Sequence, residues 1–217
     1  DETDQAGASI GVGITDGTRQ YSAMSSSETG LSTTDTYRRM SNTTCVTLIK
    51  DTDGTVLLAG AYSSFPTDGV EILWSTIAGY ATGAIPQITV DLFGGTDMSV
   101  RAGTFTSVAP AADEDDSITV SDVGFEADVL AVFSCGSTTA FGTTGNGGLL
   151  SVGFVNNAGG GVITTASLNM KSTDAVSTTD LYNHVSTAYA VAMPNAQDPS
   201  IYIDTFGSSG FKVWTPA

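Results

Sequence analysis

Ile10–Trp74 decides the fold, because the chain writes its three blocks twice: IGVGITDG (10–17), LSTTDTY (31–37) and GVEILW (69–74). The second set, in the same order, reads LSVGFVNN (150–157), VSTTDLY (176–182) and GFKVW (210–214). The Ser-Thr-Thr-Asp runs of the two middle blocks match at one constant offset, as do Tyr37 and Tyr182. Repeated blocks in a fixed order indicate an internal duplication. A feature that the fold needs is therefore expected in both copies.

The duplication predicts two modules, at residues 1–102 and 103–217. The 217 residues would give each module about 100, a common domain size. GTFTSV (103–108) and SITVSDVGFEADVLAVFSC (117–135) precede the second copy, whereas only nine residues precede Ile10 in the first. The first module is therefore predicted to lack its opening strands. Asp1 in place of Met favours processing or a fragment.

The composition is acidic and sparing in charge. Seven Lys and Arg stand against 23 Asp and Glu, which gives a formal net charge of −16. Nucleic-acid binding needs Lys and Arg to neutralise phosphates, and adsorption to an anionic membrane surface needs them as well. No apolar run approaches the ~18 residues of a membrane-spanning helix. We therefore expect neither nucleic acid nor a membrane as a partner.

Alternation of apolar and polar residues with period two predicts strands along most of the chain. The alternation is clean at 88–92, 118–120 and 201–206, and shorter apolar runs at 46–48, 56–62 and 129–133 suit central strands. Hairpin turns are predicted at Asp16-Gly17, Asp53-Gly54, Asp68-Gly69 and Ser209-Gly210. Helix is limited to one turn at most, near Tyr37–Met40. The fold class is therefore all-β, with two tandem antiparallel β-sandwich, jelly-roll-like modules.

The core of the second module is predicted to contain seven apolar residues: Phe125, Val129, Val132, Phe133, Ile201, Ile203 and Phe206. Replacing Phe133 with Ala is then expected to cost ~3–5 kcal/mol. Cys45 and Cys135 are interpreted as buried small hydrophobes, with a disulfide as the alternative. Trp74 and Trp214 close matching strands and are interpreted as core anchors, with a sugar-stacking platform as the alternative. Tyr37 and Tyr182 are interpreted in the same way.

The histidine and glycine patterns predict structure rather than chemistry. His184 is the single histidine and matches Arg39 of the first copy, so an exposed polar strand-end position explains it better than acid–base catalysis. The glycine-rich run 142–148 lacks the Lys-Ser/Thr of a phosphate cradle and is predicted to be a flexible link between strands. Asp51-Thr-Asp53-Gly54 begins like an EF-hand loop, but the apolar run 56–58 breaks the ligand series and favours a hairpin turn.

The carboxylates show no arrangement that predicts a site. The cluster Asp113–Asp116 could hold Ca²⁺, although a solvated connection is the simpler interpretation. Glu71 and Glu126 show no pairing of the kind that a glycosidase needs. We therefore predict no catalytic, cofactor-binding or metal-binding residue, no cofactor, and a protein that is not an enzyme.

Several short blocks in a fixed order resemble modules in structural proteins of tailed phages. They are GTF (103–105), then Gly124, Phe125, Asp128 and Phe133, then the glycine-containing strands and the strands that end at Trp74 and Trp214. The segment LFGG-x-D (92–97) is similar to the connector that recurs between such modules. The resemblance implies a virion component, either a head decoration protein or a tail-associated one, and it carries no catalytic residues. The missing front of the first module departs from the pattern.

The first hypothesis for function is a non-enzymatic structural component of a phage virion, located in the extracellular particle. Its partners would be other virion proteins and copies of itself. The alternative is a receptor- or glycan-binding module of a phage tail, with a host surface glycan as ligand. A depolymerase that acts through unrecognised carboxylates is the enzymatic rival.

The abbreviated first module predicts self-association. A sandwich without its opening strands exposes a sheet edge and an apolar face. Upstream residues, a strand from a neighbour or burial against a symmetry mate would each cover them. We expect the isolated chain to self-associate, with residues 1–102 contributing much of the contact.

Overall fold

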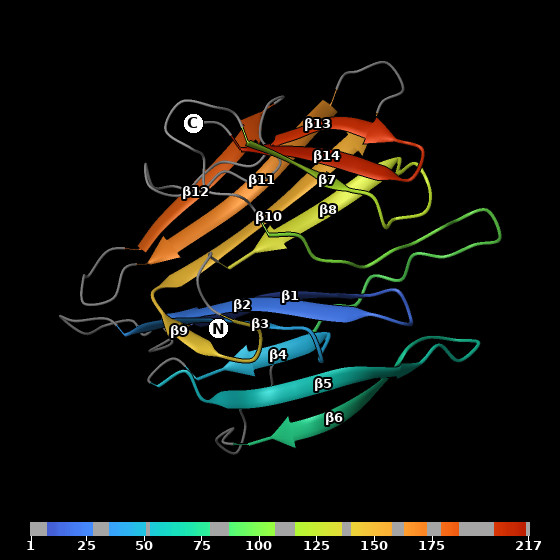
Figure 1. Ribbon diagram of the computed structural model, residues 1–217. Helices are drawn as coiled ribbons and strands as arrows, with labels where there is room; N and C mark the ends of the chain where they lie inside the picture. Colours follow the sequence, from blue (N-terminus) through green and yellow to red (C-terminus); the bar gives the residue numbers. More distant parts are fainter. Residues whose placement is uncertain are drawn as a thin grey trace. The chain divides into compact units, whose positions relative to one another are not determined.

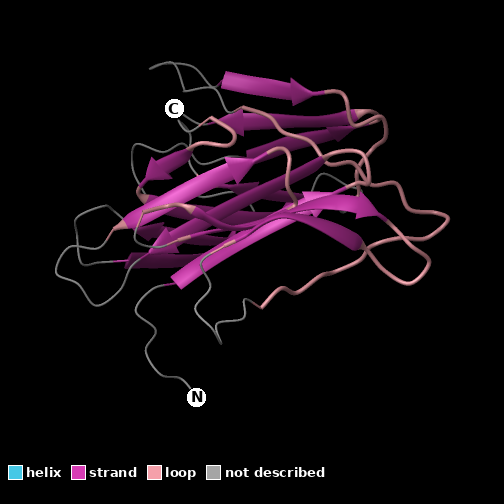
Figure 2. Cartoon of the chain, turned by 90° about the horizontal axis from the view of Figure 1, so that it is seen from below, coloured by secondary structure: helices cyan, strands magenta, loops and turns pink. Residues whose placement is uncertain are grey.

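The computed structural model describes residues 8–27, 35–50, 53–78, 87–106, 116–135, 140–157, 163–172, 179–186 and 202–215. Every regular element in these ranges is a β-strand, as Figure 2 shows, and none of these residues forms a helix that could cross a membrane. All the strand pairs are antiparallel. The predicted all-β antiparallel class is confirmed. The helical turn allowed near Tyr37–Met40 is wrong, because those residues belong to a strand.

The chain divides into two compact units, of which unit 1 holds residues 1–103, 138–147 and 174–177. Its sheet A has the order β1-β2-β3-β9, and its sheet B has the order β4-β5-β6 (Figure 1). The strands of sheet A are β1 (Ala8–Thr15), β2 (Gln20–Ser27), β3 (Thr36–Ser41) and β9 (Thr144–Asn146). Those of sheet B are β4 (Val46–Ile49), β5 (Val56–Ser64) and β6 (Glu71–Ile77).

Polar side chains join the two sheets of unit 1. The Ser22 hydroxyl on β2 lies 2.8 Å from the Thr47 hydroxyl on β4, which lies 2.7 Å from that of Thr44. All three residues are buried, so these hydrogen bonds remove the penalty of burying hydroxyls without partners. Gly13 permits the close approach, because a Cβ there would lie 1.7 Å from the Cys45 carbonyl oxygen. β4 therefore packs directly on β1 and β2.

The fourth strand of sheet A comes from the second half of the chain. β9 pairs with β3, with Arg38 opposite Gly145 and Arg39 opposite Thr144. The prediction of a flexible link at 142–148 is wrong here, because Gly142 and Gly147 bound a short strand rather than a loop. Both glycines have a φ of +81°, and their N–H groups donate to carbonyls at the two ends of β3. The partner of β3 is thus a later part of the same chain, a source that the sequence did not suggest.

Side chains hold β9 to its neighbours. The Arg39 Nη1 donates to the Thr144 hydroxyl over 3.1 Å, and that hydroxyl donates to the Gly54 carbonyl over 3.1 Å. The Arg38 Nη1 donates to the Gly147 carbonyl over 3.3 Å. Both arginines therefore have structural partners in the segment that supplies β9.

Unit 2 holds residues 104–137, 148–173 and 178–217. Its sheet C has the order β12-β11-β10-β8, and its sheet D has the order β13-β14-β7. The strands of sheet C are β8 (Val129–Ser134), β10 (Gly148–Asn157), β11 (Ile163–Ser172) and β12 (Thr179–Ser186). Those of sheet D are β7 (Asp116–Val120), β13 (Tyr202–Gly207) and β14 (Gly210–Thr215).

The core of unit 2 takes residues from both of its sheets. Val132 on β8 and Val155 on β10 form one buried cluster with Ile203, Phe211 and Val213 of sheet D. Partly buried apolar residues surround this cluster: Phe105, Val120, Val123, Leu130 and Phe206. Sheet C and sheet D therefore share one apolar interior.

The core prediction is confirmed for Val132 and Ile203, and Phe206 packs on the cluster half-buried. It is wrong for Val129, which is 62% exposed. Leu130 and Val132 point inward, so alternation along β8 turns Val129 and the half-buried Phe133 to the opposite face. Phe125 is also half-buried, and Ile201 lies outside the described residues. The apolar run 129–133 misled because both faces of β8 carry apolar residues.

The turn and cysteine predictions are confirmed. The four predicted hairpin turns join β1 to β2, β4 to β5, β5 to β6 and β13 to β14. Gly17 and Gly54 have φ values of +85° and +67°, which side chains other than glycine's rarely tolerate. Cys45 and Cys135 are free and buried, and burial raises the pKa of the Cys45 thiol. The element bounds also confirm the strands expected at 46–48, 56–62, 118–120 and 129–133.

Phe211 is expected to contribute more to stability than Phe133, because it lies in the buried cluster and Phe133 does not. Phe211→Ala should lower the unfolding free energy by ~3–5 kcal/mol, and Phe133→Ala by about 1–2 kcal/mol. The exposed Val129 is the control, and its change to Ala should stay within about 0.5 kcal/mol. Urea unfolding followed by circular dichroism measures all three. Equal losses for the two phenylalanines would contradict this assignment.

Gly54→Ala should destabilise the protein by about 1–3 kcal/mol, because its backbone is left-handed. The new methyl group would also lie 2.4 Å from the Thr144 Cγ2 atom, which belongs to β9. Gly69→Ala is the matched control, since a Cβ there meets nothing within 4 Å. Thermal melts of both variants test the expectation. A Gly54→Ala melt equal to that of the control would show that β9 yields without cost.

Candidate functional site

Where the structure describes them, the residues that the sequence singled out for chemistry lie on separate strands and turns of the two units. His184 lies within β12 opposite Ser167, not at the strand end, and nothing is described of its side chain. Its sequence counterpart Arg39 binds Thr144 and thus holds β9. Among the described residues, no group of three His, Cys, Asp or Glu lies close enough to hold a metal ion.

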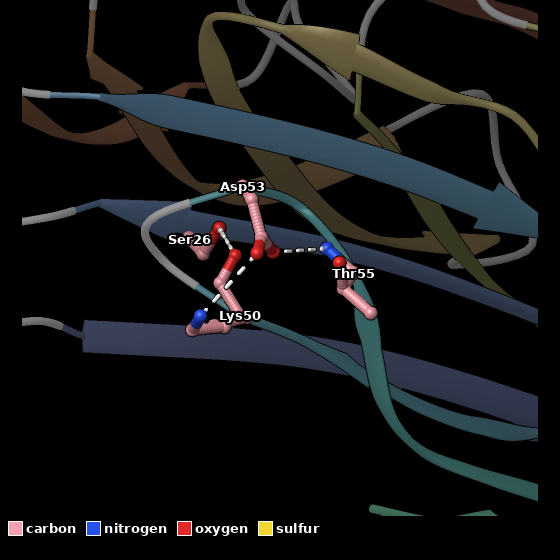
Figure 3. A network of polar contacts seen from close by, with 4 residues as sticks. All are labelled: Ser26, Lys50, Asp53 and Thr55. Atoms are coloured by element: carbon pink, nitrogen blue, oxygen red, sulfur yellow. Dashed lines mark hydrogen bonds and ion pairs between the residues drawn. The ribbon is translucent and has the colours of Figure 1, made fainter. Parts of the chain in front are cut away.

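Asp53 belongs to a hairpin turn, as predicted, and its carboxylate is used locally (Figure 3). Oδ1 accepts the Thr55 N–H over 2.9 Å, and Oδ2 lies 3.3 Å from the Lys50 Nζ. The Ser26 hydroxyl donates to the Lys50 carbonyl over 3.4 Å, which ties the turn to β2. Hydrogen bonds from Thr55, and after them the Lys50 ammonium, lower the pKa of Asp53. The hairpin-turn interpretation, which the sequence favoured over an EF-hand loop, is therefore confirmed.

The other carboxylates that the sequence analysis considered for a site are also engaged or lie mostly outside the described residues. Glu71 accepts the Ser63 and Ser64 hydroxyls, and Glu126 accepts the Asn157 side-chain amide. Glu71 belongs to unit 1 and Glu126 to unit 2. The cluster Asp113–Asp116 lies outside the described residues except for Asp116, the first residue of β7.

The most distinctive surface of unit 1 is β6. It pairs with β5 on one side, and no described strand pairs with its outer edge (Figure 1). Leu73 is 67% exposed and Ile77 is 70% exposed. The prediction of Trp74 as a core anchor is wrong, because its side chain is 38% exposed and contacts the strand beside it at Gly60. The side chain of Trp214 is outside the described residues.

Leu73 is exposed although it lies on the inner face of sheet B. Thr47 on β4 reaches sheet A through its hydroxyl, and Ala59 on β5 is opposite Thr47. Ala61, two residues further along β5, points to the same face, and Leu73 is opposite Ala61. Leu73 therefore faces the side on which sheet A lies, yet nothing described covers it. Leu73 therefore lies where a core residue is expected, but its side chain is exposed.

A second unpaired feature follows β6 in the chain. Residues 87–100, which we call the arm, are exposed throughout and form no strand (Figure 1, green). The strand predicted at 88–92 is therefore wrong. The alternation is present in the exposed Ile88, Val90 and Leu92, but no described strand supplies backbone partners. An exposed segment with an apolar strand pattern is expected to pair with another strand, because pairing satisfies its backbone groups.

The arm is anchored at its far end. The Ala102 N–H, which is buried, donates to the Asp16 Oδ2 in the turn between β1 and β2 over 2.9 Å. Asp16 Oδ1 accepts the N–H groups of Thr18 and Arg19. Burial opposes ionisation, but hydrogen bonds from Arg19, Ala102 and Thr18 outweigh it and lower the pKa of Asp16. The turn thus fixes where the arm ends.

Comparisons with protein-family models, curated proteins and solved structures give no match. The resemblance to structural proteins of tailed phages therefore stays a prediction. The candidate site that the described residues provide is a surface of unit 1. It consists of the open edge of β6, with Leu73, Trp74 and Ile77, and of the arm.

Asp16 is expected to make the arm anchor sensitive to acid. Folding lowers the pKa of Asp16 below its ordinary value of 3.8, so the ionised carboxylate stabilises the anchor fully at pH values above 3.8. This contribution is lost as the pH falls through the lower pKa of the folded protein. Asp16→Asn should accelerate hydrogen exchange of the Ala102 amide at neutral pH. Asp97→Asn, a change at an exposed arm aspartate, is the control. Unchanged protection of Ala102 in Asp16→Asn would contradict the anchoring role.

Proposed function

We propose that the two units are copies of one β-sandwich module, produced by an internal duplication. The matched sequence blocks support this proposal, because they fall on corresponding strands. β1, β2 and β3 form an antiparallel meander, as do β10, β11 and β12. β5 and β6 form a hairpin, as do β13 and β14. In this scheme β6 corresponds to β14, and Leu73, which precedes Trp74, corresponds to Val213, which precedes Trp214.

The copies differ in what flanks the corresponding strands. β14 has β7 along its outer edge, and β10 has β8 beside it. No described strand takes either position beside β6 or beside β1. The consequence is visible in one residue pair, since Val213 is 1% exposed and Leu73 is 67% exposed. Within the described residues, unit 1 therefore lacks the cover that β7 and β8 give to unit 2.

The function that this surface supports best is that of a non-enzymatic structural component of a phage virion, a capsid decoration or tail-associated protein. Such a component acts through contacts with other virion proteins and with copies of itself. The single observation that carries the proposal is the uncovered core position of Leu73 beside an open strand edge. Monomeric proteins normally protect such edges, because they template pairing with other chains.

The net charge of the chain makes the proposed self-association depend on salt concentration. A formal charge of −16 makes copies repel one another at low ionic strength, which keeps them apart before assembly. At physiological ionic strength, salt screens this repulsion between charges that are more than about 8 Å apart. Association through apolar edges should therefore strengthen as salt is added.

The alternative function is glycan or receptor binding by a phage tail, and the exposure of Trp74 favours it specifically. An exposed indole offers an apolar face on which a sugar ring can stack. However, the indole already lies against Gly60, so closely that a Cβ added to Gly60 would lie 2.7 Å from the Trp74 Cζ3 atom. A glycan array distinguishes the alternatives, since binding that Trp74→Ala abolishes would support the glycan function.

The purified chain is expected to self-associate at micromolar concentration, and its weight-average mass should rise between low and physiological salt. Sedimentation velocity over a hundredfold range of concentration measures this. Leu73→Lys should weaken association, because charge on an edge strand disfavours pairing. Val129→Lys, at a comparably exposed position on β8, is the control. A monomer at every concentration and salt level would overturn the self-assembling form of the proposed function.

A further inference from the structure

Part of the arm matches the sequence of β7, the strand for which the described residues of unit 1 offer no counterpart beside β6. Residues 88–94 read ITVDLFG and residues 118–124 read ITVSDVG, so Ile, Thr, Val and Gly recur at an offset of 30. The second segment contains the end of β7 and the turn at Gly124, which has a φ of +85°. Gly94 occupies the matching place in the arm. The arm therefore carries the pattern of a β7 strand, although it forms no strand.

In unit 2 this pattern closes the edge of β14. Ile118 is opposite Val213, Thr119 is opposite Lys212, and Val120 is opposite Phe211. Val120 and Val123 pack on the buried cluster that contains Val213. The Ile-Thr-Val triplet thus supplies backbone pairing along β14, and its valine adds apolar contact with the core.

We propose that the arm of one copy of this chain pairs with the open β6 edge of another copy, as β7 pairs with β14. The inference rests on the proposed function and specifies the contact. Alignment of Trp74 with Trp214 sets the register of the antiparallel pair. It places Ile88 opposite Leu73, Thr89 opposite Ile72 and Val90 opposite Glu71. The arm then covers part of the edge that β7 covers in unit 2.

The partner of the β6 edge is a second copy, because each chain carries both the arm and the β6 edge and does not pair the two with each other in the described structure. Its arm and its β6 are both exposed, and no described strand pairs with the arm or with the outer edge of β6. Asp16 holds Ala102, two residues after the arm, so the arm extends from a fixed point at the turn between β1 and β2. The contact joins different surfaces on the two copies, so it repeats head to tail and builds a ring or a filament.

The register is tested by cross-linking two labelled chains. Leu73→Cys is made in ¹⁵N-labelled protein and Ile88→Cys in unlabelled protein, and the mixture is treated with a short bis-maleimide. Cys45 and Cys135 are buried and give little background. Mass spectrometry should find the 73–88 link between a labelled and an unlabelled chain. Met98→Cys replaces Ile88→Cys in the control, since Met98 is comparably exposed on the arm but lies outside the triplet.

A link at Met98 as strong as that at Ile88 would overturn the register. The double variant Leu73→Cys/Ile88→Cys, diluted with an excess of the native chain, tests whether the arm folds back on its own β6. A 73–88 link confined to one chain under these conditions would overturn the exchange between copies.

A charge on the arm separates this inference from the proposed function. Val90→Glu should raise the dissociation constant for self-association by about tenfold, because the register places the new carboxylate opposite Glu71, and Met98→Glu should leave it within about twofold. Self-association that Val90→Glu does not weaken would overturn the arm contact and leave the assembly function standing. A native chain that never associates would overturn both.

Discussion

The backbone hydrogen bonds at strand edges are the constraint on which this structure depends. A strand is satisfied only when both of its sides have partners, from protein or from water, and an apolar strand in water exposes side chains as well. Unit 2 meets the constraint at β14 and β10 by placing β7 and β8 beside them. In unit 1, β9 from the second half of the sequence pairs with β3, and no described strand pairs with the outer edge of β6.

The interiors of the two units solve different packing problems. Unit 2 uses valine, isoleucine and phenylalanine from both sheets. Unit 1 buries serines and threonines between β2 and β4, where hydroxyls satisfy one another at 2.7 and 2.8 Å. Small polar side chains and Gly13 let the strands approach closely, but they bury little apolar area. Beside this polar layer, unit 1 also buries Met24 on β2 and Ile49 on β4 completely.

The local sequence pattern predicted many of the strands and turns, but it did not predict which strands pair with each other. Alternation and Asp-Gly turns located β4, β5, β7 and β8 and the hairpins, because those signals depend only on nearby residues. Whether a segment finds a partner depends on residues far away. The arm alternates as cleanly as β7 yet pairs with nothing described, whereas residues 144–146 of the glycine-rich run form a strand because β3 is there to receive them. The open edge at β6 likewise has no signature within its own seven residues.

The origin of β9 sets an order of events during synthesis. The last strand that unit 1 takes from its own half ends at Ile77, and β9 begins at Thr144, after β7 and β8 of unit 2. At the usual rate of about 5–20 residues per second, the ribosome takes several seconds to bridge that interval. During that time the edge of β3 is open on the nascent chain.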